Sequence, residues 1–318
     1  MIDRGVSAGR AAALRVWSQL PEGAREVLED KLSPTDLQTL LLDLAKTRAD
    51  KLKPPSVRQR WQQDRFVRPS PIDPHQLADT DLRLWRLLPP QFVGLALSPV
   101  TPLGTCAAVE AADQNRVLST VRLSEVVSDP TNVLALEAAV RRRAGADVVH
   151  LAACHRVLRN QRFDASDARP HFELFALVSS ARDSGSARTE AELLVLHLRF
   201  WSELMSMMLG PNTGLIELTV ISDALRERVD DLVRPALGGV RLRDAPDRTE
   251  GIGYYRAAAF KIKVADAAGE REVGDGGFTG WTAALLADVK ERCLISCVAT
   301  ERLTQLYARR QFASAMQE

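Results

Sequence analysis

"STVRLSEVVSDPTNVLALEAAVRRR" (residues 119–143) changes from a strand pattern to a helix pattern across a single turn. Val126 and Val127 favour an extended strand, whereas Asp129 is a good N-cap and Pro130 suits the first helical position. The helix pattern ends in three arginines, where the helix dipole favours cations. The stretch therefore predicts a strand, a turn and a helix. It leaves open whether Asp129 only caps the helix or also holds the charged end of a ligand.

The composition indicates an ordered globular protein without a strong electrostatic field. The 318 residues are 46% hydrophobic, which is enough for a substantial core. With 42 Lys and Arg against 41 Asp and Glu, the net charge is +1, so any basic surface must be local. The sequence contains no apolar run of about 18 residues, and its first ten residues lack a signal-like apolar block. We expect a cytoplasmic protein with no membrane segment.

The cysteine pattern predicts buried free thiols. Cys106, Cys154, Cys293 and Cys297 form no CxxC pair, and the last two lie in an apolar run. Cys154 is flanked by two histidines, His150 and His155, but two further ligands at zinc spacing are not evident. We therefore predict no metal site.

The first 77 residues divide into two regions. Residues 1–50 form a small helical region, in which Ser33 caps a helix with leucines at helical spacing. Residues 51–77 form a proline-rich connector with a basic face and two aromatic residues, Trp61 and Phe66. This mixture can stack on and neutralise RNA, but aromatics that fasten a linker to the larger domain are the interpretation we favour.

Residues 78–318 predict an α+β domain with a mainly antiparallel sheet flanked by helices. A helix is expected near 79–88, and several strand patterns follow one another without a long helix between them. The strand-like stretches are 92–97, 147–153, 171–180, 214–222, 259–266 and 293–299, and the helical ones are 132–143 and 189–209.

The order of polar motifs in this domain is more informative than any one of them. The capped turn at Asp129 is followed by a strand carrying Arg156, an arginine-rich loop, and a second strand entered at Phe172. Next come "GIGYYRAAAFKI" (251–262), glycine-rich "GDGGFTGW" (274–281), and a strand leading into "ATERL" (299–303). This succession resembles the catalytic core of class II aminoacyl-tRNA synthetases, and within them the histidyl branch, over roughly residues 78–310.

The resemblance implies roles for individual residues. A carboxylate that binds the amino acid falls on Asp129, and the arginine that contacts the ATP α-phosphate falls on Arg156. The other substrate-binding positions implied are Thr131, Tyr254 and Tyr255. The nucleotide-binding positions implied are Phe172, Gly274, Gly276, Gly280 and Arg302.

The chemistry of such a site suits these residue types. Guanidinium groups at Arg156 and Arg302 can neutralise and orient phosphates, and glycines allow the backbone to approach a ligand closely. The resemblance implies ATP and Mg²⁺ as cofactors and an amino acid or related carboxylate as substrate. It predicts a ligase-like protein that adenylates its substrate for an acceptor other than a tRNA read by its anticodon.

Departures from the histidyl pattern support a second hypothesis. Glu250 replaces an arginine that helps catalysis, Leu158 replaces an acid, and Ala299 replaces a glycine, while Gly277 and Thr279 replace an arginine and an aspartate. The chain also leaves no room after residue 310 for an anticodon-binding domain. The alternative is a non-catalytic protein, similar to the histidyl-like regulatory subunit of ATP phosphoribosyltransferase, that binds a small molecule or a protein partner.

The assembly expected from the resemblance is a homodimer. Class II cores usually pair through the region before the turn at Asp129, and "FVGLALSPVTPLG" (92–104) is apolar enough to need covering.

Overall fold

The computed structural model describes residues 3–160, 169–251, 253–266 and 269–315. By their internal contacts, the residues group into two compact units. The smaller unit comprises residues 1–64 with 119–124, and the larger comprises 65–118 with 125–318. The boundaries predicted at residues 50 and 77 stay predictions, since these units divide the chain at other positions.

The smaller unit is helical. Its helices are α1 (Asp3–Trp17), α2 (Ala24–Glu26), α3 (Pro34–Ala49) and α4 (Pro54–Gln63). Ser33 caps α3 as predicted, because its Oγ accepts a hydrogen bond from the Asp36 N–H at 3.1 Å. The residues of α4 are exposed, and 48% of Trp61 is accessible to solvent.

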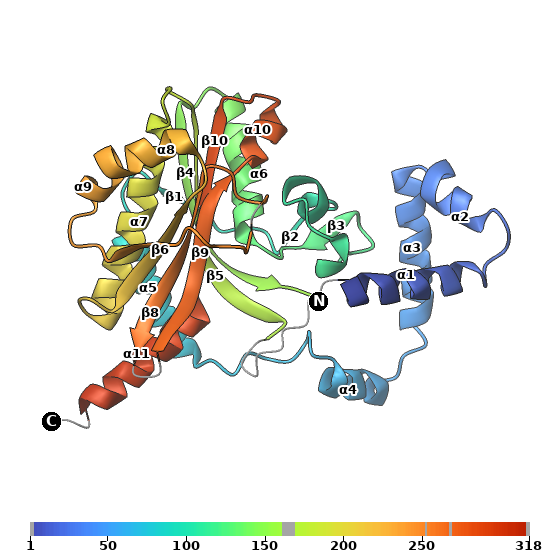
Figure 1. Cartoon of the computed structure of the whole chain (residues 1–318). Helices are drawn as coiled ribbons and strands as arrows, with labels where there is room; N and C mark the ends of the chain where they lie inside the picture. The colour runs from blue at the N-terminus through green and yellow to red at the C-terminus, as the bar shows by residue number, and fades with distance from the viewer. Residues whose placement is uncertain (1–2, 161–168, 252, 267–268, 316–318) are drawn as a thin grey trace. The chain divides into compact units, whose positions relative to one another are not determined.

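The larger unit contains the sheet (Figure 1). Its helices are α5 (Pro74–Leu87), α6 (Pro130–Arg143), α7 (Arg188–Leu209), α8 (Asp223–Arg228), α9 (Arg234–Ala236), α10 (Trp281–Leu286) and α11 (Thr300–Ala315). The strands of the chain are β1 (Val93–Gly94), β2 (Val100–Pro102), β3 (Ser124–Val126), β4 (Val148–Leu158), β5 (His171–Arg182), β6 (Gly214–Val220), β7 (Leu242–Asp244), β8 (Ala258–Asp266), β9 (Gly269–Thr279) and β10 (Glu291–Ala299). Across the ranges that the structure describes, no helix is both long and apolar enough to cross a membrane.

Within the described residues, eight strands form one sheet in the order β1-β4-β5-β10-β9-β8-β6-β7. The pairs from β4 through β6 are antiparallel, and only the short edge strands β1 and β7 pair in parallel. The prediction of an α+β fold with a mainly antiparallel sheet is confirmed. Each of the predicted strand stretches overlaps a strand of the structure.

The glycine-rich stretch, which carries no strand pattern and is not among the predicted strands, lies mostly in β9 (residues 269–279) in the interior of the sheet. Glycine is needed there for packing between strands. A Cβ added at Gly274 would collide with the carbonyl oxygen of Cys297 on β10. The high glycine content therefore reflects close strand contact, which periodicity of side chains cannot reveal.

Different helices cover the two faces of the sheet. Helices α6 and α10 pack on one face, and α5, α7 and α11 pack on the other (Figure 1). Side chains alternate along β4, so Leu151 and Ala153 belong to the α6 core whereas Ala152 belongs to the α7 core. This alternation decides which face of the sheet each charged residue at the end of β4 can reach.

A chain of buried polar groups crosses the α7 side of the core. The Ser179 Oγ lies 2.7 Å from Nδ1 of His150 and 2.8 Å from Nε2 of His197. On its other side, His197 Nδ1 lies 2.8 Å from the Ser296 Oγ, which also accepts a hydrogen bond from Trp201 Nε1 at 2.9 Å. Burial lowers the pKa of His197 to about 3, so the imidazole is neutral and both its nitrogens are partnered.

A buried ion pair fixes the C-terminal end of α6. Arg142 Nε and Nη2 donate to the two carboxylate oxygens of Glu291 at 3.0 and 2.7 Å. Only 9% of the Arg142 side chain and 4% of the Glu291 side chain are exposed. Arg142 Nη1 also donates to the Asp147 carbonyl at 2.5 Å, so the guanidinium is bonded along both of its edges.

Candidate functional site

A cavity of about 570 Å³ lies on the α6 face of the sheet, beside the N-terminus of α6. Its wall contains residues from β5, β9, β10, α11 and the segment before β8. Charged side chains of both signs line it. The cations are Arg116, Arg159, Arg169, Arg248, Lys261 and Arg302, and the acids are Glu110, Asp129, Glu250, Glu272, Asp275 and Glu301.

Asp129 lies in this wall and makes three hydrogen bonds. Its Oδ1 accepts the Thr131 N–H at 2.9 Å and the Thr131 hydroxyl at 2.7 Å, which caps α6 as predicted. Its Oδ2 accepts Arg159 Nη2 at 3.0 Å. The carboxylate is therefore both a helix cap and half of an ion pair, and Thr131, which also lines the cavity, holds it in place.

Arg159 connects the turn to the predicted nucleotide-binding aromatic. Its Nε donates to the Ser128 carbonyl at 2.9 Å, and its guanidinium carbon lies 5.2 Å from the ring centroid of Phe172. Both Arg159 and Phe172 line the cavity. One arginine thus fixes the turn and contacts the Phe172 ring by a cation–π interaction.

Arg156, the predicted phosphate-binding residue, is not among the residues that line this cavity. It pairs across the strands with Glu173, and its Nη1 lies 2.7 Å from the Glu301 carboxylate on α11. Arg156 is an even number of residues from Ala152 along β4, so its side chain lies on the same face as Ala152, opposite to α6. Its role toward phosphate stays a prediction, and the arginine that the structure brings to the cavity is Arg159.

Tyr254 and Tyr255 are brought together as a T-shaped pair in the cavity wall, with ring centroids 4.8 Å apart. The Tyr255 hydroxyl donates to Asp275 Oδ2 at 3.0 Å. Burial and nearby carboxylates, chiefly Asp129 for Tyr254 and Asp275 for Tyr255, raise both pKa values. Both phenols are therefore neutral, and their rings form apolar wall of the cavity.

The remaining predicted residues divide between the cavity and its surroundings. Gly274 lines the cavity, and Arg302 also lines it while its Nη1 donates to the Glu272 carbonyl at 2.8 Å. Gly276 and Gly280 do not line it. Gly280 lies against the Arg256 guanidinium, which would have to move to make room for a Cβ.

Several charged residues of the cavity were not singled out from the sequence. Arg248 and Asp275 come from the segment before β8 and from β9, and Glu110 comes from the loop before β3. Burial and the neighbouring Asp129 raise the pKa of Glu110. Arg159 could have been found from strand parity, but the others have no periodic signal because they lie in irregular segments or in β9, which was not predicted.

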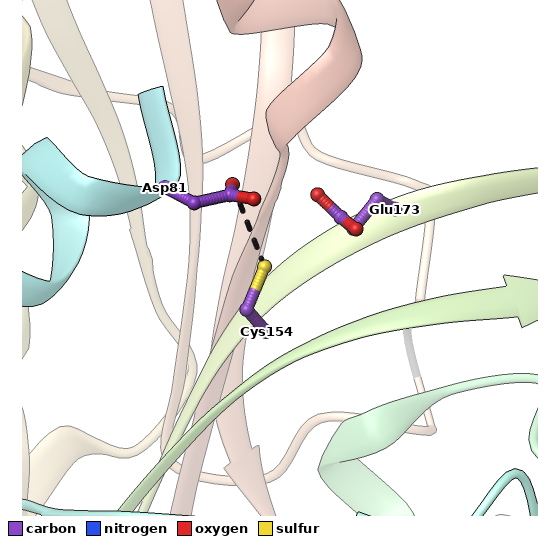
Figure 2. A group of neighbouring side chains, drawn as sticks. All are labelled: Asp81, Cys154 and Glu173. Atoms are coloured by element: carbon purple, nitrogen blue, oxygen red, sulfur yellow. Dashed lines mark hydrogen bonds between the residues drawn. The ribbon is translucent and has the colours of Figure 1, made fainter. Parts of the chain in front are cut away.

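A second polar cluster lies on the opposite face of the sheet (Figure 2). Ligand atoms of Asp81, Cys154 and Glu173 lie within 4.8 Å of one another, and the Cys154 thiol donates to Asp81 Oδ1 at 3.6 Å. Burial and the adjacent Glu173 raise the pKa of Asp81 to about 7. Such a trio can share a proton or accept a cation. All four cysteines are free thiols, but burial holds as predicted only for Cys106 and Cys293, whereas Cys154 and Cys297 are partly exposed.

The arrangement of the sheet and helices is that of known proteins. Apo S. aureus histidyl-tRNA synthetase superposes with a TM-score of 0.54 at 13% identity, over 74% of this chain and 68% of that one. The chain contains a class II synthetase-like core. An ATP phosphoribosyltransferase regulatory subunit/histidyl-tRNA synthetase from Bacillus halodurans gives a TM-score of 0.55 at 11% identity, over 76% of this chain and 83% of that one.

A third class II synthetase-like relative has the highest overlap of the three. The histidine–tRNA ligase subunit from Alicyclobacillus acidocaldarius gives a TM-score of 0.57 at 9% identity, over 78% of this chain and 97% of that one. No protein-family model and no curated protein matches the sequence. The structural similarity establishes the fold of the class II-like core. At identities this low it does not establish the chemistry, which depends on the residues of the cavity.

Proposed function

We propose that the cavity of this class II synthetase-like core binds an amino acid or a related amino carboxylate. The observation that supports this proposal is the arrangement of Asp129 in the cavity wall beside the neutral Tyr254 and Tyr255. A carboxylate oxygen that already accepts Arg159 can accept a ligand ammonium as well, because each oxygen has two lone pairs. The tyrosine rings supply apolar surface for the body of the ligand.

ATP with Mg²⁺ is the second ligand we propose: its adenylyl group would be joined to the ligand carboxylate, and pyrophosphate would be the leaving group. Arg302 and Phe172 are the residues of the wall suited to a phosphate and to a base. The carboxylates of Glu272 and Glu301 stand in the same wall and are paired with Lys261 at 3.0 Å and Arg156 at 2.7 Å. A triphosphate beside these acids needs a cation between them, so we expect ATP to bind only with Mg²⁺.

A sensor or regulatory function is the second candidate, and the surroundings of Glu250 favour it. Glu250 lies in the cavity wall and is ion-paired with Lys261, which also contacts Glu272. A lysine held by two carboxylates is poorly placed to neutralise phosphate. In this case the core binds the amino acid without activating it, and a protein partner reads the bound state.

One pair of measurements separates the two functions. Thermal shifts should be recorded for the twenty amino acids, alone and with ATP and Mg²⁺, and ATP–pyrophosphate exchange should be measured for every amino acid that gives a shift. Exchange supports the ligase-like function. A shift without exchange supports the sensor, and no shift with any amino acid contradicts the proposal of an amino-acid site.

The assembly and the macromolecular partners are also proposals. A homodimer follows from the resemblance, and a protein partner follows from the sensor function. The basic residues and exposed Trp61 of α4 support RNA binding only through local charge and one aromatic surface.

A further inference from the structure

We propose that Arg248 is the residue that binds the carboxylate of the cavity ligand. This inference rests on the proposed function, because it assigns one group of the same ligand to one residue of the same cavity. Neither the motif order nor the strand pattern points to Arg248, which lies in the irregular segment between β7 and β8. The argument depends on how this side chain is held.

Arg248 is buried and bonded along one edge only. Its side chain is 8% exposed, and its Nε donates to the Glu250 carbonyl at 2.8 Å. The guanidinium carbon lies 5.4 Å from the ring centroid of Tyr255, which supports the planar group from one side. Its Nη2 is 3.9 Å from Asp275 Oδ2, beyond hydrogen-bond distance.

The other terminal nitrogen, Nη1, is buried and has no hydrogen-bond partner among the residues that the model describes. An unpaired buried donor costs free energy, and the cost is larger when the group is charged. A ligand carboxylate that reaches Nη1 by a small shift of the side chains around it would form a charge-assisted hydrogen bond and restore this loss. Arginine suits the task because its fork stays charged and presents its donors in fixed directions.

The charges around Arg248 favour a carboxylate over a phosphate. Asp275 and Glu250 stand in the same wall, and the neutral Tyr255 phenol does not offset their charge. A ligand group with more than one negative charge is therefore disfavoured beside Arg248. A carboxylate carries a single delocalised charge. The ammonium of the same ligand can then be accepted by Asp129 or Glu110, which lie in the wall of the same cavity.

The experiment compares four proteins: the parent, Arg248→Met, Arg248→Lys and the control Arg199→Met. Arg199 lies on α7, donates to the Ala236 carbonyl at 2.7 Å and is not part of the cavity wall. Each protein is titrated calorimetrically with the amino acids that shift the parent and with the amines that these amino acids yield on decarboxylation. The melting temperature of each unliganded protein is recorded as well.

We expect the parent and Arg199→Met to bind the amino acid at least about tenfold more tightly than the amine. Arg248→Met should lose this preference and bind both compounds equally weakly, and Arg248→Lys should retain part of it. Unliganded Arg248→Met should melt no lower than the parent, because it loses an incompletely bonded buried charge.

Three results would overturn the inference, and they are distinguishable. If Arg248→Met binds the amino acid as tightly as the parent, Arg248 is not the carboxylate site, while the proposed function stands. A large fall in the melting temperature of both Arg248 variants, with the preference for the amino acid kept in Arg248→Met, would assign the residue to structure. A parent that responds to no amino acid overturns the proposed function and this inference together.

Discussion

Two buried arginines on the same side of the sheet are held in opposite ways. Arg142, at the end of α6, is bonded along both edges by the Glu291 carboxylate and neighbouring carbonyls. Arg248, in the cavity wall, has one bonded edge and a terminal nitrogen without a partner among the described residues. The side chains are equally inaccessible, at 9% and 8% exposed. Burial therefore does not separate the two sites, but completeness of bonding does.

The difference indicates which buried charges serve the fold. A guanidinium whose donors are all matched by protein acceptors contributes to the native structure and has nothing to offer a ligand. One that keeps an unmatched donor in a cavity wall lowers stability and keeps affinity for an anion. The predictions below test this distinction at other buried groups.

The largest effect on stability is expected at the fully bonded ion pair of Arg142 and Glu291. Arg142→Met should lower the free energy of unfolding by about 3–5 kcal/mol, because it leaves the Glu291 carboxylate buried and unpaired. Urea denaturation of the variant and the parent measures this difference. Arg248→Met, measured alongside, should show no comparable loss.

The matched control removes both charges of the Arg142–Glu291 ion pair. The double variant Arg142→Met/Glu291→Gln should regain much of the stability lost by Arg142→Met, because no uncompensated charge remains. If the single variant is as stable as the parent, completeness of bonding does not distinguish the two arginines.

The buried His197 should make the free energy of unfolding of the parent protein fall at acid pH. Its pKa is about 3 in the folded protein and 6.5 in the unfolded chain, so only the unfolded state binds a proton between these values. The stabilisation is complete above pH 6.5 and is lost as the pH falls toward 3, by about 1.4 kcal/mol per pH unit. In His197→Gln the slope should fall by this amount. Urea unfolding at several pH values compares the slopes even if the variant is less stable throughout.

Asp129 should combine a cap, an ion pair and a ligand contact. Asp129→Asn keeps an oxygen for the cap but removes the charge opposite Arg159, so we expect a loss of about 1–2 kcal/mol and no response to the amino acid. Asp73→Asn is the control, since Asp73 caps α5 by accepting the N–H groups of His75 and Gln76. It should cost only a few tenths of a kcal/mol. Equal stability of the two variants would show that the ion pair contributes nothing.

The smallest effect is expected at the partly exposed cluster of Figure 2. The Asp81 pKa is raised from 3.8 to about 7, so the folded protein binds a proton that the unfolded chain releases between these values. Stability from this group is therefore present at acid pH and lost as the pH rises through 7. Asp81→Asn should be more stable than the parent at pH 8 by about 1 kcal/mol, a figure reduced for solvent screening. Chemical denaturation at pH 5 and pH 8 tests the difference.

The sequence was sufficient to predict the sheet because its strands carry strong apolar patterns, and the Asp129 turn because capping residues act locally. It failed at β9, where glycines needed for contact with β10 look like a loop. It also favoured Arg156, although only the alternation of β4 side chains distinguishes the face of Arg156 from that of Arg159. Arg248 could not be predicted, because its unmatched donor depends on the folded path of an irregular segment.

The short strands at the two ends of the sheet limit how copies of the chain can associate. β1 has two residues and β7 has three, so each exposed border offers few free backbone donors and acceptors. A second molecule that pairs with β1 or β7 could form only a few ladder hydrogen bonds with it, which disfavours growth of a continuous fibre-like ladder through these two strands. Association of copies through β1 or β7 would therefore depend on the side chains beside these strands, where substitutions can separate association from folding.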